Sequence, residues 1–256
     1  MDATVTSAAN RRYATRPLLV ALLLLIAGCG IGALLSGYGH QLGWWDYRTG
    51  FSVLRWSVWI AAGAGVVALI AFLAAAAGKQ PRAMAMALVG AALAGAIVLP
   101  AWQHQRNGTL VPRINDITTD TDNPPAFVAV VPLRQDAPNP VTYGGAAVAR
   151  EQQAAYADIK PVRLKLPPGP AFERALATAR GMGWTIVAAE PGVGRIEATD
   201  QTRWFGFKDD VVIRVTEADG GSRVDIRSKS RIGRNDFDTN AKRVRAYSRK
   251  LEATAH

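Results

Sequence analysis

The chain has 256 residues, a net charge of +10, one cysteine and three histidines. A single cysteine excludes an intramolecular disulfide and a cysteine metal cluster. Residues 17–102 are strongly apolar and the rest is polar. The polar part beyond residue 106 has no cysteine, and its one histidine is His256. Cys-His and Ser-His-Asp catalysis and histidine metal sites are therefore excluded there.

Three uncharged runs of about 20 residues follow a short tail of residues 1–16. A helix of this length crosses a hydrocarbon core of about 30 Å, so we predict transmembrane helices at about 17–37, 53–78 and 83–102 in a membrane domain of residues 17–106. Small residues four apart, such as Ala61 with Gly65 and Gly90 with Ala94, predict that the second and third helices pack as a hairpin. The runs hold no Asp, Glu, Lys or His, so ion or proton transport is not favoured.

The orientation of the helices in the membrane is predicted from the Lys and Arg residues of the short loops, which are in excess on the cytoplasmic side. The N-terminal tail and the second loop, on one side of the membrane, have Arg11, Arg12, Arg16, Lys79 and Arg82. The other side has Arg48, Arg55, Arg106 and Arg113. The bias predicts a cytoplasmic N-terminus and a C-terminal domain in the periplasm, in a multi-pass protein of a bacterial inner membrane.

Cys29 ends the sequence IAGC, which resembles a bacterial lipoprotein signal. Lipidation of Cys29 is one interpretation, and a small-residue stretch inside a longer helix is the other. The apolar run continues through Leu35, which favours the second. Both interpretations leave the C-terminal domain outside.

Residues 107–158 are rich in Pro, Asp, Asn and Thr. We predict an extended segment that packs on the following domain, with a short helix near Ala146–Tyr156. Asp116, Asp120 and Asp122 do not have the spacing of an EF-hand loop and no glutamate completes the set, so we expect no metal site.

Residues 159–256 have a clearer pattern of alternation and turn signals. The predicted order is a strand at 159–166, a helix at 171–182, four strands ending near Ser230, and a helix at 237–251. This order predicts an α+β domain, with an antiparallel sheet and helices over one face.

Basic residues concentrate between Arg227 and Lys250, which holds nine Lys or Arg and two Asp, a local charge of +7. Strand alternation places Ile226 toward the core and Arg227 on the opposite face. One interpretation is a solvated ionic ladder of cross-strand pairs, formed by Glu197, Arg214, Asp225 and Arg227. The other is an anion-binding or partner-binding face near the start of the last helix, formed by Arg214, Arg227, Arg231, Arg234 and Arg243. Asp236 and Asp238 are expected to cap that helix.

The stretch IEATDQTRWFGFKDDVVIRV, followed by SRVDIRSKSRIGRNDFDTNAKRVRAY, resembles the bacterial and plastid domain of unknown function 1499. The upstream NDITTDTDNPPAF and QQAAYADIKPV are similar to the leading segments of this family, and preceding membrane spans resemble its membrane-anchored branch. Many members have a cysteine where this chain has Pro138–Tyr143, and glycine where it has Asp238. The aspartate at position 238, in place of glycine, predicts a shifted start of the last helix. The resemblance implies the domain and no catalytic residue.

We therefore expect a non-catalytic binding or scaffolding module that meets the membrane, another envelope protein or an anionic lipid. No catalytic, cofactor-binding or metal-binding residue is assigned. The first alternative is a carboxylate-dependent envelope enzyme using Glu197 or Asp225. The second, for a cytoplasmic domain, is binding of nucleic acid or inner-leaflet lipid through phosphate contacts, although no nucleic-acid-binding motif is present.

Overall fold

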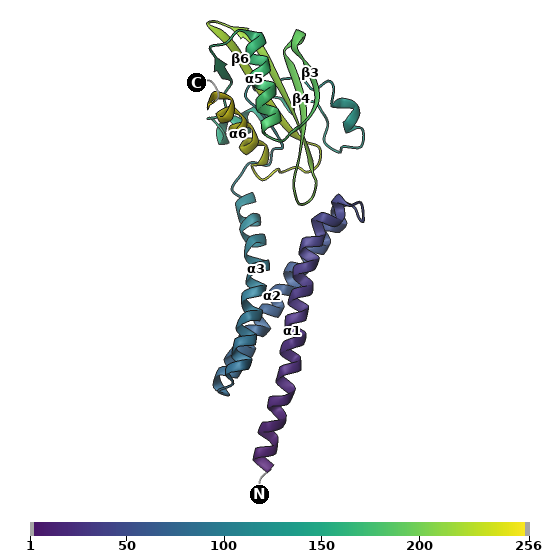
Figure 1. Cartoon of the computed structure of the whole chain (residues 1–256), viewed down its shortest axis with the longest axis vertical. Helices are drawn as coiled ribbons and strands as arrows, with labels where there is room; N and C mark the ends of the chain where they lie inside the picture. Colours follow the sequence, from purple (N-terminus) through teal and green to yellow (C-terminus); the bar gives the residue numbers. More distant parts are fainter. Residues whose placement is uncertain (1–2, 254–256) are drawn as a thin grey trace. The chain divides into compact units, whose positions relative to one another are not determined.

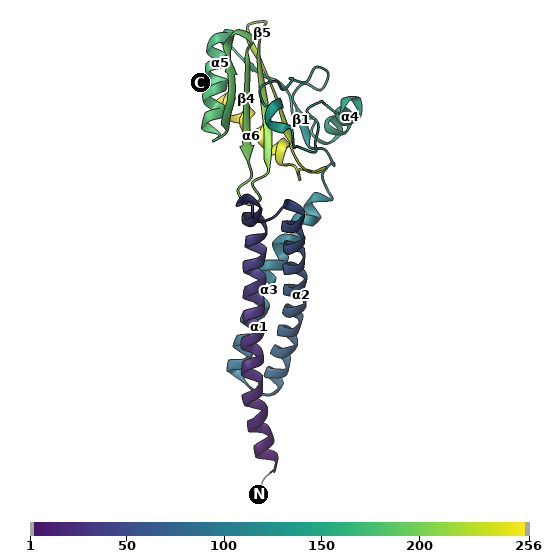
Figure 2. The same ribbon diagram turned by 90° about the vertical axis from the view of Figure 1, so that its right-hand side faces the viewer.

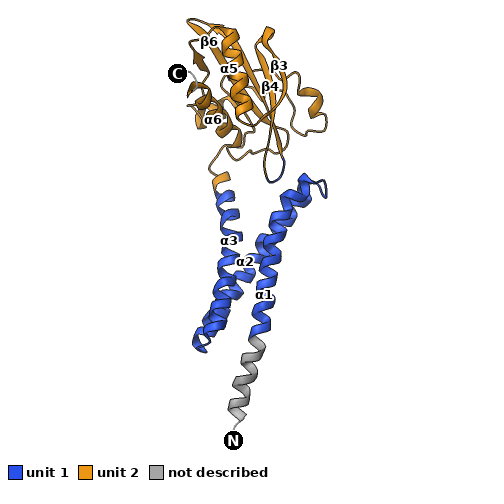
Figure 3. Cartoon of the chain, viewed as in Figure 1, with its two compact units in different colours: residues 1–106, 204–206 blue, residues 107–203, 207–256 orange. Residues whose placement is uncertain are grey.

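The computed structural model describes the backbone of residues 3–253 and the side chains of residues 16–253. The chain divides into two compact units (Figure 3). Unit 1 consists of residues 1–106 with 204–206, and unit 2 of residues 107–203 with 207–256. Arg11 and Arg12, which enter the orientation prediction, lie outside the described side chains.

Unit 1 holds three long apolar helices, α1 (Ala3–Gln41), α2 (Tyr47–Ala77) and α3 (Pro81–Gly108) (Figure 1). By length and composition each can cross a membrane. All three begin before their predicted starts, and α1 and α3 also continue beyond their predicted ends, because caps and turns end a helix and the hydrocarbon edge does not. Asp46 caps α2 by accepting hydrogen bonds from the backbone N–H groups of Arg48 and Thr49, at 2.7 and 2.9 Å.

Small residues let α2 and α3 pack closely, as their spacing predicts. Ala61 and Ala68 on α2 are fully buried. A Cβ atom on Gly65 would lie 2.9 Å from that of Ala94 on α3, closer than side chains tolerate. Close backbone approach of this kind is a common way for membrane helices to associate.

Unit 2 contains a six-stranded sheet in the order β1-β6-β5-β4-β3, with β2 also paired to β6. Every pairing is antiparallel. The strands are β1 (Asp116–Thr118), β2 (Val162–Leu164), β3 (Thr185–Glu190), β4 (Arg195–Gln201), β5 (Lys208–Ala218) and β6 (Gly221–Ser230). The helices are η1 (Val131–Arg134), α4 (Gly145–Ala155), α5 (Pro168–Gly181), η2 (Pro191–Val193) and α6 (Thr239–Ala253). The predicted α+β class, with strand, helix, four strands and helix from residue 159, is confirmed.

Residues 107–158 carry more structure than an extended segment. Asp116 and Thr118 of β1 pair with Lys229 and Arg227 of β6. The helix expected near residues 146–156 is α4. Gln152 of this helix is fully buried, and its amide exchanges two hydrogen bonds with the backbone of Thr118, at 2.9 and 2.6 Å.

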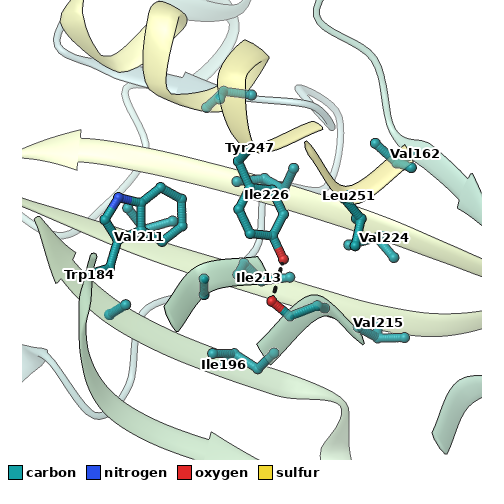
Figure 4. Close-up of a cluster of buried hydrophobic side chains, with 14 of the residues drawn as sticks. Val162, Trp184, Ile196, Val211, Ile213, Val215, Val224, Ile226, Tyr247 and Leu251 are labelled. Carbon is teal, nitrogen blue, oxygen red and sulfur yellow. Dashed lines mark hydrogen bonds between the residues drawn. The ribbon is translucent and has the colours of Figure 1, made fainter. Parts of the chain in front are cut away.

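One face of the sheet packs against α5 and α6 and forms the apolar core. Val211 and Ile213 of β5 and Ile226 of β6 point into it (Figure 4). Tyr247 of α6 stacks on Trp184 with a centroid distance of 5.2 Å, and its hydroxyl donates to the Ala175 carbonyl at 2.8 Å. In Figure 2 the sheet is seen close to edge-on, with α5 on one side. This is the face that the alternation predicts to be buried.

The opposite face is covered too. Phe127 and Val130, from the segment between β1 and α4, pack on Val212 of β5. Glu197 and Asp225, on the same face, have no exposed surface. Alternation identifies the residues that share a face, but it does not say what covers that face, so the prediction of a solvated face is wrong.

Helix α6 begins at Thr239, two residues after the predicted start at residue 237. Phe237 and Asp238 have positive φ angles of 52° and 70°, and the helix begins at Thr239. Glycine occupies such a conformation without strain, and aspartate is among the residues that tolerate it. Asp236 caps the helix, because its carboxylate accepts from the backbone N–H groups of Asp238 and Asn240 at 3.0 and 2.8 Å.

Candidate functional site

Arg227 lies at the centre of a buried charged cluster beneath the covering segment, by which we mean residues 119–143. Its guanidinium donates to both oxygens of Asp116 at 2.8 Å and to the carbonyls of Pro125 and Val141 at 3.1 and 2.9 Å. Phe127 flanks the guanidinium at 4.9 Å from its ring centroid. Bidentate geometry and aromatic packing suit arginine better than lysine, and four of its five N–H donors have a partner.

Lys229 shares the same carboxylate. Its ammonium lies 2.7 Å from Asp116 and 2.9 Å from the Thr142 carbonyl. Burial lowers the pKa of Lys229, while the neighbouring Asp116 acts in the opposite direction. Burial, followed by the charge of Asp116, raises the pKa of Tyr143 to about 12.

Asp210 is the centre of a second cluster on the same face. It accepts hydrogen bonds from Arg134 of η1, from Arg231 at 2.8 and 2.9 Å, and from the Thr199 hydroxyl at 2.7 Å. Burial by itself raises the pKa of Asp210. The hydrogen bonds from Arg231, Thr199 and Arg134 outweigh that effect, and the pKa lies below its ordinary value.

Asp225 and Arg214 pair across β5 and β6 at 2.9 Å, as the ladder interpretation proposes. Arg223 also binds Asp225. Asp120 of the covering segment lies 3.0 Å from Arg214 and 2.8 Å from Arg223. The pair therefore belongs to a four-member network that ties two strands to the covering segment.

Glu197 has a different environment. Its carboxylate accepts hydrogen bonds from the backbone N–H groups of Val128, Ala129 and Val130 at 2.9–3.0 Å. Arg195 lies 3.2 Å away. The carboxylate thus closes a backbone turn of the covering segment, a role that needs the partner segment and that strand pattern alone does not reveal.

Arg243 lies on the helix side of the sheet. It pairs with Asp209 at 2.7 Å and with Asp200 at 2.8 Å, and it also donates to Asn240 and Ser228. Burial lowers the pKa of Arg243, but the charges of Asp209 and Asp200 outweigh it and leave the pKa raised. The guanidinium stays charged and pins α6 to β4 and β5.

The five arginines of the proposed anion face are thus distributed over both faces of the sheet. Four are bound to carboxylates within unit 2, and Arg234 is exposed in the loop before α6. Within the described part of the chain, at least six of the nine cations between Arg227 and Lys250 form ion pairs with carboxylates. The local excess of positive charge is therefore largely balanced by acidic residues from other parts of the chain.

The sequence pattern does not identify several residues of these clusters, namely Arg134, Phe127, Tyr143 and Asn240. The aspartates of the Pro-rich segment are a signal for these clusters, because Asp116 and Asp120 bind arginines of the sheet instead of a metal ion. Among the described residues no group of three or more His, Cys, Asp or Glu is arranged to hold a metal ion.

Cys29, the candidate for lipidation, lies within α1, which continues for twelve residues beyond it to Gln41. Its side chain is buried, with 7% of its surface exposed.

The model of a family described as protein of unknown function (DUF1499) matches residues 116–251. No curated protein and no solved structure matches the chain. The match runs from the first residue of β1 into α6. It therefore spans the sheet, the covering segment and all the buried charged clusters described above.

Proposed function

Because the chain belongs to the DUF1499 family, whose function is unknown, and carries three candidate membrane helices, we propose that it is a membrane-anchored binding or scaffolding protein. In this proposal unit 2 is a non-catalytic module presented on the periplasmic side of a bacterial inner membrane. The observation that carries the proposal is the engagement of its charged side chains in internal, buried ion pairs.

The first support comes from the carboxylates that an enzyme would need. Glu197 and Asp225 have no exposed surface. Each is held by several donors that also fix the covering segment. A general acid or base must come within hydrogen-bonding distance of a substrate proton, and these groups instead have structural partners at that distance.

The second support concerns the surface that remains for a partner. The covering segment exposes apolar side chains at Val128, Val131 and Leu133, with 49%, 40% and 54% of their surface accessible. Exposed apolar groups that lie near one another are typical of interaction sites. We propose this short stretch, rather than the basic stretch, as the binding surface of the module.

The orientation rests on the loop charges. Lys79 and Arg82 lie at the turn between α2 and α3, on the side of the N-terminal tail. Three spans place the two ends of the chain on opposite sides. With basic loops retained in the cytoplasm, unit 2 faces the periplasm.

Protease access to a tag at the C-terminus tests this orientation. We expect cleavage in intact spheroplasts. Protection until lysis would place unit 2 in the cytoplasm, and Arg234 and the other exposed cations would then be tested for binding to nucleic acid and inner-leaflet lipid.

Photocrosslinking in intact cells tests the binding surface. A photoreactive residue at Leu133 is expected to give a discrete product with another envelope protein. Val193, which is 62% exposed on η2, provides the control position. Equal yields of one product from both positions would overturn the assignment of this surface.

Carboxyl modification tests the alternative of a carboxylate-dependent enzyme. A carbodiimide with an amine is expected to label the exposed Glu217 in the folded full chain and to leave Glu197 unlabelled. Labelling of Glu197 at a similar rate would show that a substrate can reach it, and would favour the enzyme.

A further inference from the structure

Unit 1 contains a cavity of about 1010 Å³ between its three helices. This volume is at the upper end of the roughly 300–1,000 Å³ that small-molecule sites occupy. In Figure 1 α1 and α3 diverge toward the end of α3 that leads to residue 108. Pro100, inside α3, lines the cavity, and a proline inside a helix removes a backbone hydrogen bond and commonly bends it.

The chemistry of the lining changes along the helices. Its polar members, Arg55, His104 and Gln105, come from the beginning of α2 and the end of α3. Because α2 and α3 are antiparallel neighbours joined by a short turn, these positions lie at the same end of the helices. Residues deeper in the spans, such as Ile26 and Leu93, are apolar. The cavity therefore has one polar end and one hydrocarbon-like end.

The length of the lining matches one leaflet of a bilayer. On α3 it runs from Leu93 to Gln105. At a rise of 1.5 Å per residue this is about 18 Å, and half of a hydrocarbon core is about 15 Å. An acyl chain that enters from the interface would end near the middle of the membrane, where the lining ends.

Arg55 supplies charge complementarity. Helices α2 and α3, residues 47–108, contain no Asp or Glu. Within the part of the chain that the structure describes, Arg55 takes part in no ion pair, unlike the arginines of the charged clusters in unit 2. A cation on a membrane helix without a carboxylate nearby is suited to the phosphate of a lipid headgroup.

From these observations we propose that the cavity is a binding site for an anionic phospholipid of the surrounding bilayer. Its acyl chain lies in the space lined by α1, α2 and α3, and its headgroup phosphate pairs with Arg55. The inference concerns unit 1 alone, so it does not depend on the role or the side proposed for unit 2.

The test measures lipid retained by the purified full chain. The protein is exchanged into a mild detergent with equal amounts of phosphatidylglycerol and phosphatidylcholine of the same acyl chains, and bound lipid is counted by native mass spectrometry. We expect wild type to retain phosphatidylglycerol preferentially. Arg55→Ala should lower that preference about fivefold, which corresponds to about 1 kcal/mol for one basic residue near an anionic headgroup.

Two further variants separate a built site from general contact with lipid. Arg48→Ala makes the same charge change on the same helix but outside the cavity lining, and it should leave the preference unchanged. Ala96→Phe fills the lining with a larger side chain and should reduce binding of both lipids. Equal retention of both lipids by wild type, or equal loss in Arg48→Ala and Arg55→Ala, would overturn the proposal.

Discussion

The two faces of the sheet in unit 2 are both buried, but they are covered in different ways. The helix face is covered by α5 and α6 through a contiguous apolar cluster that includes Ile213, Ile226 and Tyr247. The opposite face is covered by the covering segment. Besides a small apolar cluster, this face has buried ion pairs and hydrogen bonds centred on Asp116, Asp210, Asp225 and Glu197.

The difference follows from what each covering element can offer. A helix satisfies its own backbone and presents a side-chain stripe, so apolar packing is enough. An irregular segment has unpaired backbone groups that must be bonded when they are buried. Arg227 and Arg134 donate hydrogen bonds to carbonyls of the segment. Glu197 accepts hydrogen bonds from its N–H groups.

The largest expected effect comes from Asp116→Ala. This change leaves Arg227 and Lys229 buried without their carboxylate, and breaking a buried ion pair in this way costs about 3–5 kcal/mol. Ile226→Val on the helix face, at a fully buried position, is the control and should cost about 0.5–1.5 kcal/mol. Denaturant unfolding of the full chain in detergent measures both.

A triple variant, Asp116→Leu with Arg227→Met and Lys229→Met, sharpens the same comparison. Replacing the whole cluster by apolar groups removes the unpaired charge, so it should recover part of the stability that Asp116→Ala loses. The recovery should be incomplete, because the carbonyls of Pro125 and Val141 then lack the donors that Arg227 supplies. If Asp116→Ala is no more destabilising than Ile226→Val, the charged face does not hold the covering segment.

Acid should weaken the charged face selectively. The folded-state pKa of Asp210 is lowered, so the unfolded chain takes up the proton first. The stabilisation from Asp210 is present above its ordinary pKa of about 3.9 and is lost as pH falls through the folded-state value, by about 1.4 kcal/mol for each unit of depression.

Asp210→Asn provides the measurement for this prediction. Its deficit in unfolding free energy relative to wild type should shrink as the pH is lowered from 6 toward 2. A deficit that stays constant over this range would show that Asp210 does not titrate as its hydrogen bonds predict.

The smallest expected effect is that of Arg245→Ala. Arg245 pairs with Asp158 at 2.6 Å, but 26% and 58% of the two side chains are exposed. Exposed ion pairs contribute about 0–1 kcal/mol, so the variant should lie within about 1 kcal/mol of wild type. A loss as large as that of Asp116→Ala would mean that burial does not separate the two kinds of pair.

Much of the fold could be predicted from the sequence because the signals are local. Uncharged runs of about 20 residues predict helices α1–α3, and the alternation in β5 and β6 predicts which residues share a face. Small residues on α2 and α3 predict their close packing. The residues NDITTDTDNPPAF and the basic stretch near the C-terminus are enough to indicate the family, which the match over residues 116–251 supports.

The partners of the basic stretch could not be predicted in this way. Lys229 and Asp116 are 113 residues apart, and Arg227 and Val141 are 86 apart. No period in the sequence connects such positions. A run of cations read locally therefore resembles an exposed basic face, whereas in the folded chain distant aspartates neutralise most of it.

The sequence by itself determined the three long apolar helices, the α+β class and the division of strand residues between two faces, because these depend on hydropathy and period over short windows. Only the tertiary structure decided that β1 pairs with β6, that a Pro-rich segment buries the second face, and that Arg227 and Glu197 stabilise this segment. The physical reason is that these hydrogen bonds and this burial form between residues far apart in the sequence. A local sequence pattern does not indicate which distant residues will meet.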